Sequence, residues 1–401
     1  MKILISSLTY PLPNGVTVSI DASVDGLITE GYKALIVAPR YKTIKHRPEH
    51  CQVPSSSVAR AIGSLIGKEE RTFGVTARYH IEKIAKEFKP DIYWLHTLTW
   101  APNAFELHML KSEKPKVLSY HTLVEEYGRM YGGKIGADLM RRRSKSVANK
   151  MDAVIVPSKV IEQKLREYGV VKPIYVIPTG INIIKDYFTK EELGAKFSLP
   201  SDSKILLYVG RVCKEKNIEA LLKMMGEIKK KDSNIFLLIV GPGDIEKFKS
   251  TVQNMNIADR VIFAGFFPAK ETQRMYGGSD VFVFSSKSET QGLVIGEAMM
   301  AEIPVVALES QIQPEIYPES LSVVVKNESQ FSFAVLDILK NCKKRDEMVK
   351  KAKEFVLENF SREAMTKKQK ELFLKIHNKS KTELPFMEAK VKKRTEFSSP
   401  I

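Results

Sequence analysis

Short apolar runs alternate with longer amphipathic stretches along most of the chain. In the first half, the longer stretches predict helices such as 76–88 and 101–111. Short runs rich in Val, Ile and Leu that alternate with helices are typical of a parallel sheet with helices on both faces. The strands that this pattern predicts are 3–6, 34–37, 92–96, 117–120 and 153–156.

The same alternation restarts after a polar stretch at about 180–203. We therefore predict an α/β protein of two Rossmann-like, doubly wound domains, 1–180 and 181–360, that face each other across a cleft. In such sheets ligands bind outside the carboxyl ends of the strands, so functional residues are expected just after strands. The second set of predicted strands is 205–209, 235–240, 261–264, 281–284, 305–307 and 323–325.

The C-terminal region has two further helical patterns, 345–358 and 362–377, which are strongly basic and amphipathic. We expect a helix at about 361–378 to complete the first domain. The tail 380–401 has no clear periodicity, and we expect it to be mobile.

The amino-acid composition restricts the expected cellular location of the protein and the classes of partner that it can bind. Hydrophobic residues make up 43% of the 401 positions, and no run of about 18 apolar residues that could span a membrane occurs. The three cysteines, Cys51, Cys213 and Cys342, form no metal-binding pattern, so a reducing cytoplasm is expected. The net charge of +16 is explained either by anionic partners, namely nucleic acid, an anionic membrane surface or anionic small substrates, or by a solvated lysine-rich surface.

Candidate chemistry follows two of the predicted strands. Arg211 and Lys216 come just after 205–209, and two cations at that position suit a diphosphate. After 281–284, a helix that begins near Gly292 would direct free backbone N–H groups at a phosphate. Glu289 and Glu297 flank this turn, and each carboxylate can accept hydrogen bonds from the hydroxyls of a sugar. No Asp-x-Asp pair occurs, so we expect no metal-held nucleotide.

The segments GRVCKEKN, VGPGD, SETQGLVIGEAMM and VIPTGIN together resemble the retaining glycosyltransferases of family 4, which have the GT-B fold. The segments SYHTLVEEY and ETQGL are similar to those of the bacterial branch that transfers glucose or galactose from a UDP-sugar to diacylglycerol. The resemblance extends to about residue 378. It implies a metal-independent enzyme without cofactor, whose donor is a UDP-hexose.

Individual roles also come from this resemblance. Arg211 and Lys216 would bind the donor diphosphate, Glu289 the hydroxyls of the transferred sugar, and His121 would lie near the sugar and the acceptor. The other residues to which the resemblance gives a part in binding the nucleotide-sugar are Gly15, Gly241, Phe266, Gln291, Gly292, Leu293 and Glu297.

The segment 132–150 predicts a basic amphipathic helix. Ile135, Leu139 and Val147 recur at multiples of four residues and would form its apolar side. Such a helix can lie in a membrane interface and favour anionic lipid, which would place the protein at the inner face of the cell membrane. A helix with one packed face and a solvated basic face is the alternative. The membrane-binding candidates are Lys134, Arg141, Arg142, Arg143 and Lys145.

The function predicted from the sequence is transfer of a hexose from UDP-glucose or UDP-galactose to a membrane lipid such as 1,2-diacylglycerol. A second hypothesis keeps the enzyme class but changes the acceptor to a cell-envelope saccharide, phosphatidylinositol or a sterol. A third hypothesis is a basic nucleic-acid-binding protein, but no RNA-binding aromatic motif or zinc-finger spacing supports it. The sequence does not decide whether the donor sugar is glucose or galactose, which acceptor is used, or what the oligomeric state is.

Overall fold

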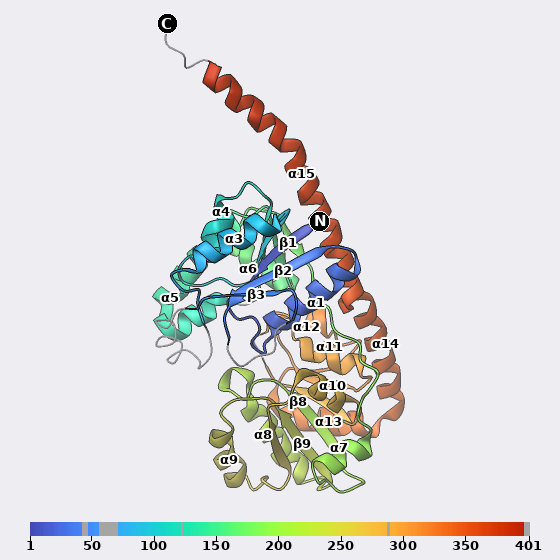
Figure 1. Cartoon of the computed structure of the whole chain (residues 1–401). Coiled ribbons are helices and arrows are strands. Elements are labelled where there is room, and N and C mark those ends of the chain that lie inside the picture. Colours follow the sequence, from blue (N-terminus) through green and yellow to red (C-terminus); the bar gives the residue numbers. More distant parts are fainter. Residues whose placement is uncertain (42–46, 56–70, 122, 287–288, 397–401) are drawn as a thin grey trace. The chain divides into compact units, whose positions relative to one another are not determined.

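The computed structural model describes residues 1–41, 47–55, 71–121, 123–286 and 289–396 of the 401-residue chain. The chain forms two compact units (Figure 1). The first unit contains Met1–Gly180 and Met365–Ile401, and the second contains Ile181–Ala364. Both are α/β units, and each is considered by itself below.

The first unit contains a seven-stranded sheet in the order β3-β2-β1-β4-β5-β6-β7, and all its strand pairs are parallel. Its strands are β1 (Lys2–Ser6), β2 (Lys33–Pro39), β3 (His50–Val53), β4 (Ile92–Leu95), β5 (Lys116–Ser119), β6 (Ala153–Val156) and β7 (Ile174–Val176). Its helices are α1 (Gly15–Thr29), α3 (Ala77–Phe88), α4 (Ala104–Lys111), α5 (Val124–Ala148), α6 (Lys159–Glu167) and α15 (Arg362–Glu396), which enters this unit at Met365.

Both faces of this sheet are buried because successive strand residues point to opposite sides. In β1, Ile3 and Ile5 join a core cluster that contains residues of α1 and α15, whereas Leu4 joins the cluster on the other face. The C-terminal helix therefore supplies part of the first unit's core. Figure 1 shows α15 running alongside α1.

Helix α15 continues through Glu396. This differs from the sequence pattern, which gave no periodicity beyond residue 380. Extending an existing helix adds one hydrogen bond for each residue that is fixed and requires no new nucleation step. Residues of high helix propensity, such as Glu, Lys, Ala and Met, can therefore extend the helix beyond the segment that packs against the first unit.

The second unit contains a six-stranded sheet in the order β10-β9-β8-β11-β12-β13, again with parallel pairs. Its strands are β8 (Lys204–Val209), β9 (Ile235–Val240), β10 (Val261–Gly265), β11 (Val281–Phe284), β12 (Val305–Leu308) and β13 (Val323–Val325). Its helices are α7 (Lys190–Lys196), α8 (Ile218–Lys229), α9 (Ile245–Asn254), α10 (Ala269–Gly277), α11 (Leu293–Met300), α12 (Gln313–Ile316), α13 (Phe331–Lys340), α14 (Cys342–Phe360) and two 3₁₀ turns, η1 (Lys214–Lys216) and η2 (Glu328–Gln330).

The predicted α/β fold with two parallel-sheet domains is confirmed, and every predicted strand is present to within two residues. Two strands were missed, β3 and β7, which lie at the edges of the first sheet. Both are only three or four residues long and are largely half-buried, so they lack the fully apolar runs that marked the central strands. Within the described ranges no helix is long and apolar enough to cross a membrane.

Candidate functional site

Two loops of the second unit lie together because they follow neighbouring strands. β8 and β11 pair in parallel, so the loops after Val209 and after Phe284 leave the same edge of the sheet. A hydrogen bond of 2.8 Å from Ser285 Oγ to the carbonyl oxygen of Lys216 joins the two loops. The predicted diphosphate-binding and sugar-binding residues therefore meet at one edge.

Lys216 and Glu289 form the closest ion pair of this edge. Lys216 ends the short turn η1, its Nζ lies 2.5 Å from Glu289 Oε1, and the two side chains are 13% and 18% exposed. An ammonium group has three N–H donors, so Lys216 can hold Glu289 and still bind a second anion. The pair brings a positive group and the carboxylate predicted to bind sugar hydroxyls to one place.

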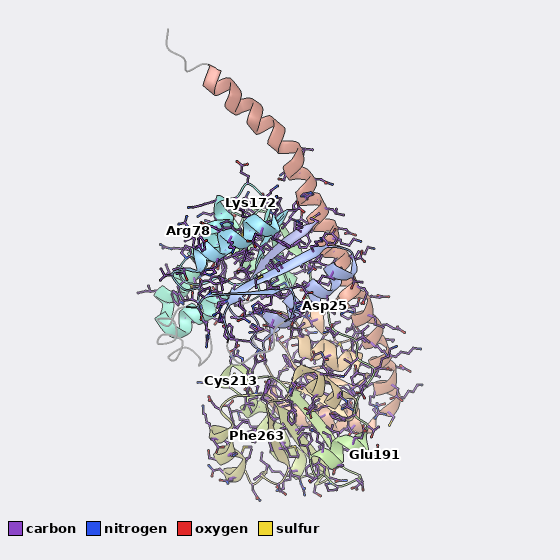
Figure 2. All side chains as sticks on the ribbon, in the orientation of Figure 1. Asp25, Arg78, Lys172, Glu191, Cys213 and Phe263 are labelled. Atoms are coloured by element: carbon purple, nitrogen blue, oxygen red, sulfur yellow. The ribbon has the colours of Figure 1, made fainter. Side chains whose placement is uncertain are left out.

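Arg211 is more exposed than Lys216, at 55% of its side chain. Its Nη2 donates to Glu215 Oε2 at 3.1 Å, and the other oxygen of Glu215 lies 3.9 Å from Lys216 Nζ. Glu215 thus connects the two cations, a role that its place inside the motif GRVCKEKN did not reveal. Cys213, labelled in Figure 2, lies between them in the sequence, caps the start of η1 and is half-buried.

Helix α11 starts at this edge after a residue in the left-handed conformation. Gly292 has φ 70° and ψ 53°, and a Cβ there would lie 3.1 Å from Ile312, so glycine is the residue that fits this backbone. The first turn of α11 carries no acidic side chain. The leading N–H groups and the positive end of the helix dipole are therefore not offset by a carboxylate within that turn. Gln291, just before Gly292, is buried, and Leu293 is half-buried.

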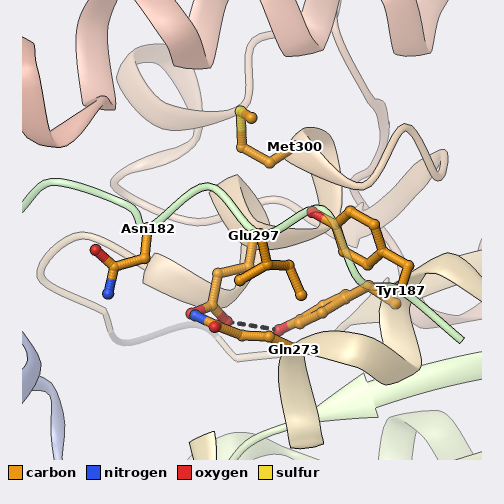
Figure 3. Close-up of a pocket in the computed structure, with 7 residues that line it drawn as sticks. Asn182, Tyr187, Gln273, Glu297 and Met300 are labelled. Carbon is orange, nitrogen blue, oxygen red and sulfur yellow. Dashed lines mark hydrogen bonds between the residues drawn. The ribbon is translucent and has the colours of Figure 1, made fainter. Parts of the chain in front are cut away.

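Glu297 lies one turn further along α11 and lines a small pocket (Figure 3). Its carboxylate accepts hydrogen bonds from Tyr276 Oη at 2.9 Å and Gln273 Nε2 at 3.1 Å. Burial raises the pKa of this carboxyl group, and the two hydrogen bonds act in the opposite direction. Asn182 and Tyr187 line the same pocket. Sequence reasoning found Glu297 but gave no role to these four neighbours: Asn182 ends the segment VIPTGIN, and the other three belong to no motif.

Two of the residues predicted to take part in binding the nucleotide-sugar follow strands β9 and β10. Gly241 comes directly after β9, its N–H donates to the carbonyl oxygen of Gly265 at 2.8 Å, and a Cβ there would lie 2.0 Å from the carbonyl oxygen of Gly210. Its φ of 143° also favours glycine. Phe266, immediately after β10, is 56% exposed. The exposed aromatic residue thus lies beside a tightly packed group of glycine backbones.

Two further candidates belong to the first unit. Gly15 is the first residue of α1, whose cap residue Asn14 accepts hydrogen bonds from Val16 and Thr17. His121 follows β5, and its Nε2 lies 2.9 Å from Nδ1 of His96, which follows β4. Burial lowers the pKa of His121 to about 4. Sequence reasoning missed His96, although it lies in the position just after a strand where functional residues were expected.

The predicted apolar side of the helix 132–150 is wrong. Val147 is fully buried, whereas Ile135 and Leu139 are 83% and 51% exposed. Residues twelve apart on a helix differ by about 120° around its axis, so a repeat of four does not stay on one face. The backbone is also non-helical at Gly132 and Gly133, which interrupts α5.

The basic residues of this segment also divide into two groups. The side chain of Arg143 points into the first unit, because it donates hydrogen bonds to the buried carboxylate of Glu106 and to the carbonyl oxygen of Thr99. Its assignment as a membrane-binding residue is therefore wrong. Arg141 pairs with Asp138 and Glu125, whereas Lys134, Arg142 and Lys145 are exposed.

Among the described residues, no three or more histidine, cysteine or acidic side chains lie together where they could hold a metal ion.

Comparison with known proteins identifies the family. The model described as glycosyltransferase family 4 matches residues 13–185, and the model described as glycosyl transferases group 1 matches residues 189–355. The alpha-monoglucosyldiacylglycerol synthase of Streptococcus pneumoniae is 28% identical over 319 residues, which are 76% of this chain and 70% of that protein. The enzyme of the same name from Acholeplasma laidlawii is 27% identical over 325 residues, 76% of this chain and 80% of that protein.

Among solved structures, HepE of Anabaena in complex with UDP-glucose matches with a TM-score of 0.75 at 15% identity, covering 94% of this chain and 100% of that one. That likeness concerns the fold. The two sequence models, which together match residues 13–185 and 189–355, show that the chain belongs to the family 4 glycosyltransferases, and the structural likeness shows that it has their GT-B fold.

Proposed function

We propose that this glycosyltransferase moves a hexose, glucose or galactose, from a UDP-sugar to a membrane lipid such as 1,2-diacylglycerol, with retention of the anomeric configuration and without a metal ion. The observation that carries the proposal is the group formed by Lys216, Glu289 and the start of α11 at the edge shared by β8 and β11. A cation and free helix N–H groups suit a diphosphate, and the adjacent carboxylate suits sugar hydroxyls.

The relatives support the choice of donor and acceptor. Two proteins named alpha-monoglucosyldiacylglycerol synthase match about three quarters of the chain, and a protein of the same fold was crystallised with UDP-glucose. We infer from them a UDP-hexose and a diacylglycerol-based lipid for this chain.

The proposed reaction is a same-face displacement. The acceptor hydroxyl oxygen forms a bond to the anomeric carbon while the bond from that carbon to the UDP oxygen breaks. The departing phosphate takes the acceptor's proton, so UDP leaves from the face that the acceptor enters. Lys216, Arg211 and the helix N–H groups would stabilise the negative charge that grows on the phosphate. Positioning and charge stabilisation are then the protein's main tasks.

Turnover of a radiolabelled UDP-sugar tests the function. The purified protein is incubated with UDP-glucose or UDP-galactose and with vesicles that contain diacylglycerol, and the lipid phase is then analysed. We expect a labelled glycolipid whose anomeric configuration matches that of the donor. Parallel vesicles with phosphatidylinositol or a sterol in place of diacylglycerol test the other acceptors. Label that enters only phosphatidylinositol, only the sterol or only a soluble saccharide would contradict the assignment of diacylglycerol as the acceptor.

The exposed side of α5 is the proposed membrane contact and supports a location at the inner face of the cell membrane. Ile135 and Leu139 project from it together with the exposed residue Arg142. Trp100, 42% exposed, lies against Gly136 of the same helix. Aromatic, aliphatic and basic side chains together are typical of segments that rest in the headgroup region of anionic membranes.

Replacing Arg142 with alanine is expected to weaken binding to vesicles rich in anionic phosphatidylglycerol about fivefold, since one basic residue near such a surface contributes about 1 kcal/mol. Vesicle sedimentation at low salt measures this. Lys231→Ala, an exposed site in the second unit, makes the same change in net charge and should leave binding nearly unchanged. The assignment of Arg142 to the membrane contact would be contradicted if both variants bound vesicles equally weakly. It would also be contradicted if binding did not depend on the anionic lipid content or on the salt concentration.

A further inference from the structure

His96 is a buried histidine in contact with a candidate site residue. It follows β4 and His121 follows β5, and these strands are neighbours in the first sheet. His96 Nδ1 lies 2.9 Å from His121 Nε2, and the two rings are stacked with centroids 5.1 Å apart and planes 15° apart. The contact therefore joins the two side chains at the carboxyl edge of the sheet.

The surroundings of His96 hold its ring in place. The residue is 3% exposed, and its ring centroid lies 4.4 Å from that of Trp94, whose indole N–H donates to Ser119 Oγ at 2.8 Å. Its second nitrogen, Nε2, is buried and has no hydrogen-bond partner among the described residues. Within the described part of the chain, the His96 ring thus has one polar contact, which is with His121.

Both rings are neutral at physiological pH. Burial lowers the pKa of His121 to about 4 and holds the pKa of His96 well below its usual range. Each neutral ring carries one N–H and one bare nitrogen, so the hydrogen bond between them fixes both tautomers together.

The unpaired nitrogen of His96 decides between the two arrangements. If His121 Nε2 donated to His96, then His96 Nε2 would carry a buried N–H without an acceptor, and orphaned N–H groups of this kind are rare in native proteins. If His96 Nδ1 donates, its Nε2 is bare and His121 carries its hydrogen on Nδ1. The second arrangement also suits the proposed reaction, because there the phosphate takes the acceptor's proton and no histidine base is required.

We propose that His96 is a positioning residue that donates from Nδ1 to His121 Nε2 and thereby presents His121 to the substrate as an Nδ1–H hydrogen-bond donor. The inference rests on the proposed function for the role of His121 beside the sugar and acceptor. His96 acts through His121 and does not itself touch the substrate.

Ring-nitrogen NMR spectra test the tautomer without any turnover. In the full-length protein labelled with ¹⁵N-histidine, the spectra of the wild type and of His121→Ala together identify the His121 signals. We expect His121 protonated at Nδ1 in the wild type. His96→Leu removes the donor while keeping an apolar side chain, and should give a mixture of tautomers. His121 protonated at Nε2 in the wild type would overturn the proposal.

Kinetic measurements on matched variants test whether the positioning of His121 affects the rate of hexose transfer. We expect His96→Leu to lower kcat for hexose transfer about 10- to 100-fold, with little change in KM for the UDP-sugar. His96→Asn places an amide nitrogen close to the position of Nδ1, so it should restore most of kcat and the single tautomer. In a His121→Ala background, His96→Leu should have no further effect on kcat.

Two results would refute the positioning role: unchanged kcat in His96→Leu, or equal loss in His96→Leu and His96→Asn with both proteins folded by circular dichroism. A wild-type protein that transfers no hexose refutes the proposed function instead, and the tautomer spectra still decide the inference about His96.

Discussion

Replacing Lys216 with alanine is expected to reduce the turnover of hexose transfer about 10²- to 10³-fold, the usual cost of removing one preorganised group that stabilises charge in a transition state. Lys216 supplies the ammonium beside Glu289 and next to the start of α11, where the phosphate charge is proposed to grow. The fold should persist, because Glu289 keeps some contact with solvent and is not left in a fully apolar core. Initial rates at saturating UDP-sugar measure the loss, and circular dichroism checks the fold.

Lys214 provides a matched control for this experiment. It belongs to the same turn, η1, but its side chain is exposed. Lys214→Ala should therefore retain nearly all activity. If Lys216→Ala turned over at a rate close to that of Lys214→Ala, Lys216 could not be stabilising the departing phosphate.

Replacing Arg143 with alanine is expected to lower the free energy of unfolding of the first unit by about 3–5 kcal/mol, because the carboxylate of Glu106 would remain buried without its cation. Glu106 is 1% exposed and Arg143 is 12% exposed. Urea denaturation followed by tryptophan fluorescence suits the measurement, since Trp94 and Trp100, the two tryptophans of the chain, both lie in the first unit.

The adjacent arginine is the control for this effect. Arg142 is exposed on the same helix, so Arg142→Ala should leave the unfolding midpoint nearly unchanged. The double variant Arg143→Met, Glu106→Leu removes both charges and should recover much of the lost stability. Equal stability of Arg142→Ala and Arg143→Ala would show that the buried pair does not hold α5 against α4.

The strands that carry the candidate site could be predicted from sequence for a physical reason. Central strands of parallel sheets are buried on both faces and therefore appear as short, continuous apolar runs, as in β9 and β11. Residues just after such runs lie at the carboxyl edge of the sheet, where ligands bind in folds of this class, so the sequence points to Arg211, Lys216 and Glu289 as candidates. The meeting of Lys216 and Glu289 follows from the pairing of β8 with β11.

Side-chain direction on a helix and contacts between distant segments could not be predicted in this way. Arg142 and Arg143 are identical in type and adjacent, yet one is exposed and the other is paired with Glu106, 37 residues away. The contact of His96 with His121 likewise depends on the order of strands in the sheet. These facts belong to the tertiary structure, and a local pattern of apolar and polar residues does not contain them.

The return of α15 to the first unit makes the second unit an insertion with two junctions. At the first junction Gly180 N–H contacts Met365 Sδ at 3.1 Å, and Ile181 N–H donates to the carbonyl oxygen of Phe360 at 2.7 Å. Both ends of the inserted segment therefore lie close together. A chimaera that exchanges residues 181–364 with the equivalent segment of a relative would therefore leave the amino- and carboxyl-terminal pieces of the first unit joined in one core, so the second unit could be replaced as a whole.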